Sequence, residues 1–439
     1  MRSLILGAFV ALGFLAPGNA EARFMGVYDY PFVSPFAATV AATPPANQAT
    51  LLSTARLAEI TEVRHLEVFP NRQVPPVFWY YGDGMPYGVL KQRRPNAPLF
   101  FVIGGTGAGF DSSKSQMLAG VLYQAGFHVV TLASPTHPSF IVTASSQGVP
   151  GQLEVDGHDL YDVMNTIAGQ LSGEIGISGY YVGGYSLGGT HAAYVSYIDA
   201  MEKRLNFEKA IVINPAVDLY NSVNRLDDMV NKHLSNDPVA VDKFIDHIFD
   251  QVIALYTVKD KVDFTDNAFM YRAYTVLEPP EQELELLIGL VFRMTSADMS
   301  FTSDVMTNSG YLVPKNAQLT STTSLTDVML EAMRLSFVNY MDGVYMPFIQ
   351  RREPNVTREE LIARASLRPI EQYLRTAPGV VMLGTQDDVI LSRDEVNWLE
   401  NVFGERARIF PTGGHCGSMD QREFIHTMLE LIWAPEARS

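Results

Sequence analysis

A serine lies between glycines where two differently patterned segments of the chain meet. Residues 180–182 are apolar or aromatic and predict the end of a buried strand, and the residues from Thr190 onward suit a helix. Between them lies GYSLG, residues 184–188, which fits G-x-S-x-G. Glycines permit a sharp turn and a close approach of strand and helix. The pattern predicts that Ser186 stands at the tip of this turn with its hydroxyl pointing outward.

Three fixed positions do not by themselves establish a nucleophile. The pattern is common by chance, and glycine-rich turns between strand and helix also occur in nucleotide-binding folds. A serine hydroxyl is a weak nucleophile near neutral pH, and it needs a base within hydrogen-bond reach and a group that orients the base. On a turn of this kind the chain order is serine, acid, histidine. A base and an acid must therefore follow Ser186.

His415 is the predicted base. Of the nine histidines, only His415 and His426 follow the last strand-like segments. His426 falls inside a helical segment, whereas His415 lies in the glycine-rich sequence PTGGHCGSM directly after the strand-like ARIF. A loop at the carboxyl end of a strand is where an α/β sheet presents functional groups.

The acid is expected after the strand-like segment GVVML, residues 379–383. The sequence GTQDDVIL includes the end of that strand and supplies two adjacent candidates, Asp387 and Asp388. A buried aspartate facing the imidazole would fix its tautomer and stabilise the imidazolium. The residue types leave both aspartates open, and Asp218, after VINPAV, is a third choice.

Four segments in this order resemble the α/β-hydrolase superfamily. GYSLG matches its nucleophile turn, GTQDDVI (384–390) resembles its G-x-x-D-x-[IV]-V segment, and GGH (413–415) resembles its G-G-H loop. VIGGTG (102–107) takes the place of its H-G-x-G loop, with Gly104 where the family often has histidine. The resemblance covers roughly residues 60–220 and 375–439, and it implies that Asp387 is the acid.

The resemblance implies a serine hydrolase that cleaves an ester. Ser186 would attack the carbonyl, His415 would transfer the proton, and Asp387 would orient His415. The backbone N–H groups of Leu187 and Thr106 would bind the oxyanion. No cofactor or metal is needed, and the expected partner is a small-molecule or acyl-ester substrate. A peptidase or amidase with the same triad, and a binding protein without catalysis, are the alternatives.

Alternating strand-like and helical segments predict the scaffold that holds these residues. The pattern is that of an α/β-hydrolase fold, with a mostly parallel central sheet and helices on both faces, built from residues 61–221 and 375–439. Strand-like segments lie at 62–69, 76–82, 98–105, 127–135, 179–186, 209–217, 379–384 and 407–410. Helical ones lie at 113–126, 155–171, 396–404 and 422–433, and the residues from Ser392 to Glu395 are expected to cap the third of these.

Residues 222–374 predict a large helical cap, with helices at 239–256, 281–294 and 325–341. Thr357 suits a helix N-cap, with Glu360 completing a capping box. Methionines and aromatics of this segment form either the cap's own core or an apolar pocket over Ser186. They are Met294, Met299, Met329, Met333, Phe337, Tyr340, Met341, Tyr345, Met346 and Phe348.

The first 22 residues predict a secretory signal peptide. A positively charged start precedes the apolar residues 4–16, and Ala20-Glu21-Ala22 offers a cleavage site after Ala20 or Ala22. Residues 23–60, rich in Pro, Ala and Thr, predict an extended lead-in. Cys416 is the only cysteine, so no intrachain disulfide can form. Export without disulfides indicates a bacterial periplasm or secretion from a bacterium.

Composition argues against several other functions. The net charge of −16 makes binding of nucleic acid or anionic membranes a poor expectation. The apolar residues 4–16 are too few for a stable membrane span. The sequence GGTGAGFDSSKS (104–115) fits neither the P-loop nor the dinucleotide-binding pattern. No H-E-x-x-H pattern or cysteine cluster predicts a metal site, and the oligomeric state does not follow from the sequence.

Overall fold

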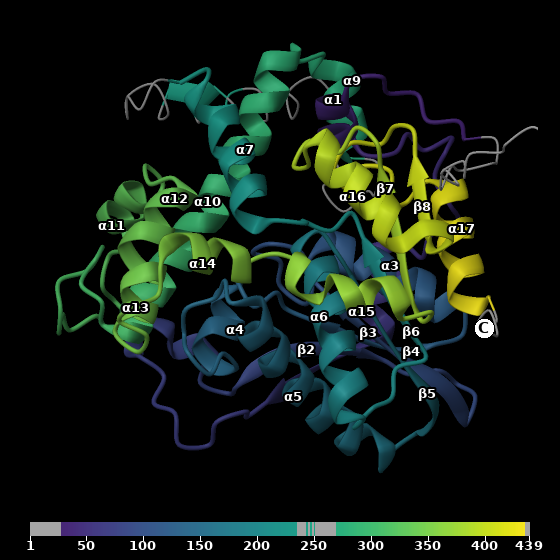
Figure 1. Ribbon diagram of the computed structural model, residues 1–439, viewed down its shortest axis with the longest axis horizontal. Coiled ribbons are helices and arrows are strands. Elements are labelled where there is room, and N and C mark those ends of the chain that lie inside the picture. Colours follow the sequence, from purple (N-terminus) through teal and green to yellow (C-terminus); the bar gives the residue numbers. More distant parts are fainter. Residues whose placement is uncertain (1–27, 235–242, 245, 248–249, 251–268, 435–439) are drawn as a thin grey trace, which may run out of the picture.

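An eight-stranded sheet forms the centre of the protein (Figure 1). The structure is a computed structural model that describes residues 28–234, 243–244, 246–247, 250 and 269–434. The strands are β1 (Thr61–Leu66), β2 (Met85–Leu90), β3 (Asn96–Ile103), β4 (His128–Leu132), β5 (Gly176–Tyr185), β6 (Lys209–Ile213), β7 (Val380–Thr385) and β8 (Ala407–Phe410).

The strand order is β1-β2-β4-β3-β5-β6-β7-β8. β2 pairs antiparallel with β1 and β4, and the strands from β4 to β8 pair in parallel. Parallel strands buried on both faces are continuously apolar, and β4, β6 and β7 are buried at every position.

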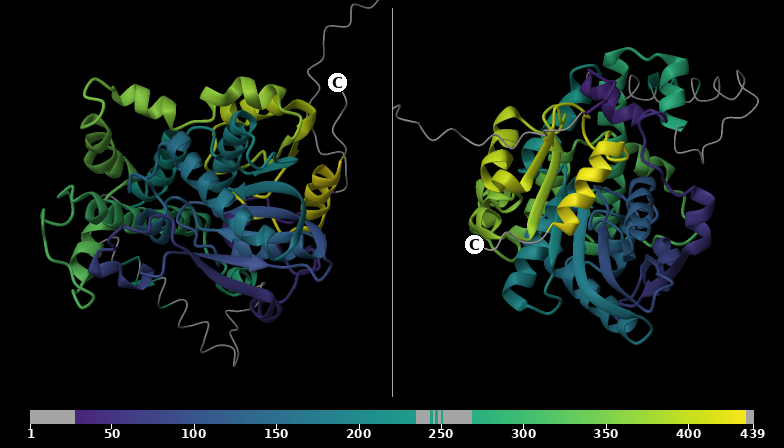
Figure 2. Two further views of the ribbon diagram at one scale, coloured as in Figure 1. Left: turned by 90° about the horizontal axis from the view of Figure 1, so that it is seen from below. Right: turned by 90° about the vertical axis from the view of Figure 1, so that its right-hand side faces the viewer.

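Helices cover both faces of the sheet (Figure 2). One face packs against α5 (Leu153–Ser172), α6 (Leu187–Glu202) and α16 (Arg393–Phe403). The other face packs against α3 (Ser113–Gln124) and α17 (Arg422–Trp433). The sheet order and these two layers confirm the predicted fold class, an α/β-hydrolase fold. The carboxyl ends of the parallel strands therefore lie along one edge, where the candidate site forms.

Between β6 and β7 the described residues form helices and loops and no strand of the sheet. The helices are α7 (Leu219–Asn231), α9 (Phe269–Leu277), α10 (Glu281–Thr307), α11 (Thr326–Ala332), α12 (Phe337–Tyr340), η2 (Met341–Tyr345), α13 (Met346–Gln350), α14 (Arg358–Arg364), η3 (Arg368–Ile370) and α15 (Glu371–Thr376). A short helix η4 (Gly404–Arg406) follows α16, and α4 (Pro138–Thr143) precedes α5.

Two of the predicted helix starts carry the expected caps. Thr357 and Glu360 form a capping box at α14, and Ser392 forms one with Glu395 at α16. The prediction of one continuous helix at 325–341 is wrong. Ser336 and Asn339 form a capping box that starts a new helix, α12, after the end of α11. The helix predicted at 239–256 and the signal peptide at 1–22 lie outside the described residues.

The predicted strand at 76–82 is wrong. These residues form the short helix η1 (Pro76–Tyr81), and the strand of this region is β2, which the sequence did not reveal. Pro75 and Pro76 lack backbone N–H groups and fix φ, so they suit a helix start better than a ladder. The aromatic residues favour strands only where packing surrounds them, and here Trp79 and Tyr80 are exposed.

The lead-in predicted as extended contains two short helices, α1 (Pro35–Ala41) and α2 (Thr54–Ile60). Ser34 and Ser53 cap them, each accepting a hydrogen bond from the backbone N–H three residues on. α1 lies beside α9 and α10 at the edge of the cap (Figure 1). Among the described residues, no helix is both long and apolar enough to cross a membrane.

Candidate active site

Ser186 occupies a strained turn between β5 and α6. Its backbone has φ 56° and ψ −129°, a combination that non-glycine residues rarely adopt and that costs on the order of 1–3 kcal/mol. A Cβ on Gly184 would lie 2.4 Å from the carbonyl oxygen of Gly188, and a Cβ on Gly188 would lie 2.3 Å from that of Ile103. The flanking glycines are therefore required, because strand and helix pass too closely for any side chain.

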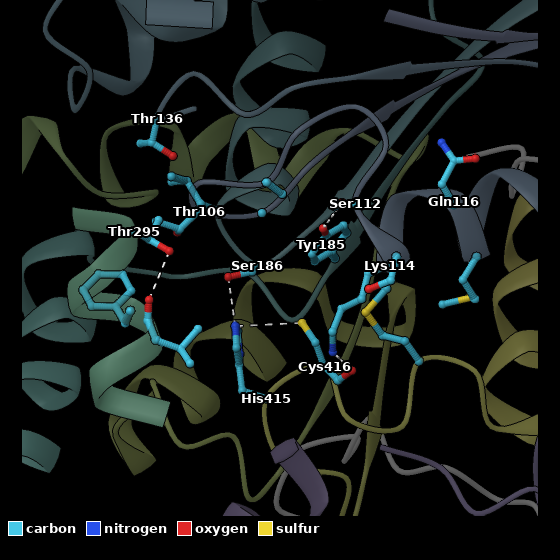
Figure 3. A pocket seen from close by; sticks show the side chains of 18 of the residues that line it. Thr106, Ser112, Lys114, Gln116, Thr136, Tyr185, Ser186, Thr295, His415 and Cys416 are labelled. Atoms are coloured by element: carbon cyan, nitrogen blue, oxygen red, sulfur yellow. Dashed lines mark hydrogen bonds between the residues drawn. The ribbon is translucent and has the colours of Figure 1, made fainter. Parts of the chain in front are cut away.

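The hydroxyl of Ser186 lies 2.8 Å from Nε2 of His415. His415 stands on the loop after β8, and Figure 3 shows its ring pointing at the serine. The structure thus brings together the two residues predicted as nucleophile and base, which are 229 positions apart in the chain.

The acid beside His415 is Asp388, so the prediction of Asp387 is wrong. Nδ1 of His415 lies 3.0 Å from both carboxylate oxygens of Asp388. Asp387 turns the other way, and its carboxylate accepts hydrogen bonds from the backbone N–H groups of Gly414 at 2.9 Å and Gly413 at 3.2 Å. Asp387 therefore holds the loop that carries His415 and does not touch the imidazole. Burial raises the pKa of Asp387, an effect that the two glycine N–H groups oppose.

Asp388 is fixed by two further hydrogen bonds. The side-chain amide of Asn214, just after β6, donates to it at 2.9 Å, and the N–H of Ile390 donates at 3.1 Å. Sequence reasoning missed Asn214, whose only signal is its place directly after an apolar strand. Asp218, the third candidate, caps α7 and accepts from the N–H of Asn221 at 3.0 Å instead.

The N-terminal helix α1 fixes the other side of the histidine loop. The hydroxyl of Thr39 accepts a hydrogen bond from the N–H of His415 at 2.9 Å and donates to the carbonyl of Pro35 at 2.7 Å. A Cβ on Gly417 would lie 2.0 Å from the carbonyl oxygen of Ala38. Residues 35–41 are thus a support of the site, which the prediction of an extended lead-in did not include.

The electrostatics of His415 favour its cationic form. Burial is the largest single effect and would lower the pKa of His415, but the Asp388 carboxylate and the Cys416 sulfur beside the ring together outweigh it and raise that pKa to about 10. The imidazole is therefore a strong proton acceptor whose protonated form is stabilised in place. His426, the other histidine considered, lies on α17 and contacts Glu430 at 3.1 Å near the surface.

Leu187 and Thr106, the residues predicted to supply backbone donors for an oxyanion hole, follow the carboxyl ends of the neighbouring strands β5 and β3. Leu187 is the first residue of α6, where N–H groups have no acceptor within the helix. Thr106 follows β3 in a loop whose next N–H, that of Gly107, donates to the hydroxyl of Thr136 at 2.8 Å. Leu187 and Thr106 line the same cavity as Ser186 and His415.

That cavity has a volume of about 1240 Å³ and extends to both sides of Ser186 and His415. In Figure 3, Thr106, Thr136 and Thr295 lie on one side, and Ser112, Lys114 and Gln116 on the other. Apolar side chains from α7 and α10 line the first side, and those of the N-terminal segment and α3 line the second. They include Leu219, Val223, Leu226, Ile288, Val291 and Phe292 for the first, and Leu52, Leu57, Ala58 and Met117 for the second.

Both expectations for the cap's methionines and aromatics hold in part. Met299 and Phe337 line the cavity. Tyr340, Met341, Tyr345 and Phe348 pack in a hydrophobic cluster of the cap that Met299 also joins and Phe337 packs against. Met294 is exposed.

Cys416 is buried next to the base, with its sulfur 3.9 Å from Nε2 of His415. Its carbonyl accepts a hydrogen bond from the Lys114 ammonium at 2.6 Å. Among the described residues, no group of three or more His, Cys, Asp or Glu side chains could hold a metal ion.

No family model and no curated protein matches the sequence. Among solved structures, the chain is similar to Est1E from Butyrivibrio proteoclasticus, with 9% identity over 80% of this chain and 94% of that chain and a TM-score of 0.36. It is also similar to a thermostable esterase from Pseudomonas putida (14% identity, 86% and 85% covered, TM-score 0.39) and to brefeldin A esterase, a bacterial homologue of human hormone sensitive lipase (14% identity, 92% and 86% covered, TM-score 0.40). The fold assignment rests on this chain's own strand order and on its turn at Ser186.

Proposed function

We propose that the protein is a serine hydrolase that cleaves carboxylic esters through an acyl-enzyme. The observation that carries the proposal is the continuous line of hydrogen-bonding groups from Ser186 Oγ through His415 to Asp388, with 2.8 Å and 3.0 Å between successive partners. A strained backbone at Ser186 supports the proposal, because such strain persists where the surrounding structure enforces it.

The reaction begins when Ser186 Oγ attacks the ester carbonyl and His415 Nε2 takes the serine proton. Asp388 holds the Nδ1–H tautomer and stabilises the imidazolium. The N–H groups of Leu187 and Thr106 donate to the developing oxyanion, and each such donor typically contributes about 3 kcal/mol. His415 returns its proton to the leaving alcohol. Water, deprotonated by the same imidazole, then cleaves the acyl-enzyme.

The cavity supports a substrate with apolar groups on both sides of the scissile bond. Fully burying a leucine- or phenylalanine-sized group contributes about 1.5–3 kcal/mol, so both sides of the cavity offer binding energy to alkyl or aryl groups. The same triad would serve a peptidase or amidase, and substrate comparison separates these classes. We further propose that the chain is exported to the periplasm or secreted, on the strength of residues 1–22 alone.

Labelling by a fluorescent fluorophosphonate tests the nucleophile. Wild type should label, and Ser186→Ala and His415→Ala should not, while circular dichroism shows that each stays folded. Ser112→Ala is the matched control, because Ser112 lines the same cavity but bonds to the Tyr185 hydroxyl at 3.1 Å. Undiminished labelling of Ser186→Ala would refute the assignment. Comparing the turnover of aryl and alkyl esters with that of matched anilides then distinguishes an esterase from an amidase.

A further inference from the structure

Part of the cavity wall carries buried polar groups that nothing in the described structure satisfies. His191, on α6, has a side chain only 1% exposed, and neither ring nitrogen has a hydrogen-bond partner among the described residues. The hydroxyl of Ser222, in the first turn of α7, is likewise buried without a partner there. Both residues line the cavity that contains Ser186, and the proposed reaction uses neither of them.

Asp156, at the start of α5, completes this group. Its carboxylate accepts a hydrogen bond from the N–H of Gly151 at 2.8 Å and lies 3.8 Å from Nε2 of His191. That distance is too long for a hydrogen bond, so Asp156 does not satisfy the imidazole. Asp156 also lines the cavity, whose lining includes the apolar side chains of Leu219, Val223, Met299 and Phe337.

Buried polar atoms in native proteins are nearly always paired, with protein, water or ligand. Three nitrogen or oxygen atoms without partners, on two residues that line the same cavity, therefore point to a group that enters from the cavity. A neutral imidazole offers one donor and one acceptor, and a serine hydroxyl offers both. An alcohol hydroxyl has the matching pair of functions, whereas a carboxylate would be repelled by Asp156.

We infer that His191, Ser222 and Asp156 form a subsite that binds a hydroxyl group of the ester substrate. The inference rests on the proposed ester hydrolysis and narrows its substrate class to hydroxylated apolar esters. Leu187 and His191 stand one turn apart on α6, about 6 Å along the helix axis. A carbonyl held at Leu187 therefore places the hydroxyl several bonds away, on a chain that follows α6.

Two ester series test the subsite. The acyl series is ethyl octanoate beside its 3-, 6-, 7- and 8-hydroxy forms, and the alcohol series is hexyl acetate beside acetates of 1,4-, 1,5- and 1,6-hexanediol. A site built to bond a hydroxyl disfavours the analogue that lacks it. We expect kcat/KM of wild type for at least one hydroxylated ester to exceed that for the parent ester about tenfold or more.

His191→Leu and Ser222→Ala should each bring that ratio of kcat/KM values down toward one. Ser222→Ala removes one atom, so it keeps the test available where His191→Leu fails to fold. His128→Leu is the matched control, because His128 is also fully buried with an unpartnered Nε2 among the described residues but does not line the cavity. It should keep the full preference.

Wild type that hydrolyses both parent esters but prefers no hydroxylated one would overturn the subsite and leave the proposed function standing. A preference that persists in both His191→Leu and Ser222→Ala would also overturn it. Failure of wild type to hydrolyse any ester, together with absent fluorophosphonate labelling, would refute the proposed function, and the subsite would fall with it.

Discussion

Neutralising Asp387 and Asp388 in turn, by substitution with asparagine, provides the sharpest test of the site. Asp388→Asn removes a carboxylate whose oxygens lie 3.0 Å from Nδ1 of His415. At an effective dielectric constant of about 20, a unit charge at that distance stabilises the imidazolium by about 5 kcal/mol. Losing it should lower kcat by about 10⁴, since each 1.36 kcal/mol corresponds to a tenfold change in rate. The value matches the loss of about 10⁴ typical of this substitution in serine proteases.

Asp387→Asn is the matched control, since it makes the same chemical change one residue away. It weakens two hydrogen bonds to Gly413 and Gly414, and hydrogen bonds to charged groups contribute about 1.5–3 kcal/mol each. We expect a lower thermal midpoint and a loss of kcat of about tenfold or less. Initial rates with p-nitrophenyl acetate and thermal unfolding by circular dichroism measure both effects. Equal losses of kcat in the two variants, or a larger loss in Asp387→Asn, would refute the assignment of Asp388.

Three further outcomes follow from the geometry. Thr39→Val removes the acceptor for the His415 N–H, so kcat should fall about tenfold, as one lost hydrogen bond predicts. Thr39→Ser keeps the hydroxyl and should keep kcat near the wild-type value. An unchanged kcat in Thr39→Val would contradict the role of Thr39 as a support of the histidine loop. The acidic limb of kcat/KM against pH should lie above the ordinary histidine pKa, because only the neutral imidazole accepts a proton and Asp388 raises the pKa of His415. Asp388→Asn should move this limb to lower pH. A limb that does not move would show that Asp388 is not the cause of the raised pKa. Gly188→Ala should abolish soluble folded protein, because its Cβ would lie 2.3 Å from a backbone oxygen; a stable variant, seen by circular dichroism, would show that the turn relaxes.

Local sequence was sufficient to predict the structure where the backbone leaves room for only one residue type. The glycines around Ser186 predict a close approach of strand and helix, and the structure shows that approach at Gly184 and Gly188. Ser186 was predicted for this reason, and His415 was predicted because it lies in a loop directly after a strand-like segment, whereas His426 lies in a helical one. The apolar runs gave most of the parallel strands, because strands buried on both faces carry a continuous signal.

Sequence was insufficient where a choice depended on distant partners. Asp387 and Asp388 are the same residue type in adjacent positions. The chain after β7 turns so that Asp387 faces the N–H groups of residues 413 and 414 and Asp388 faces His415. Asn214 and Thr39 support the site through bonds that span 174 and 376 positions. His191 carries no local pattern that distinguishes it from any other residue of a buried helix.

The contact between α1 and the histidine loop joins residues near the two ends of the chain, so it forms only after synthesis has reached residue 415. Thr39 and His415 are 376 positions apart, so Thr39 leaves the ribosome long before its partner exists. At about 5–20 residues per second, that interval lasts roughly 20–75 s. Residues 186 and 213, which meet in the turn at Ser186, are made during this interval, while residue 415 has not yet been made. The proposed triad is therefore incomplete in the nascent chain until translation has passed residue 415.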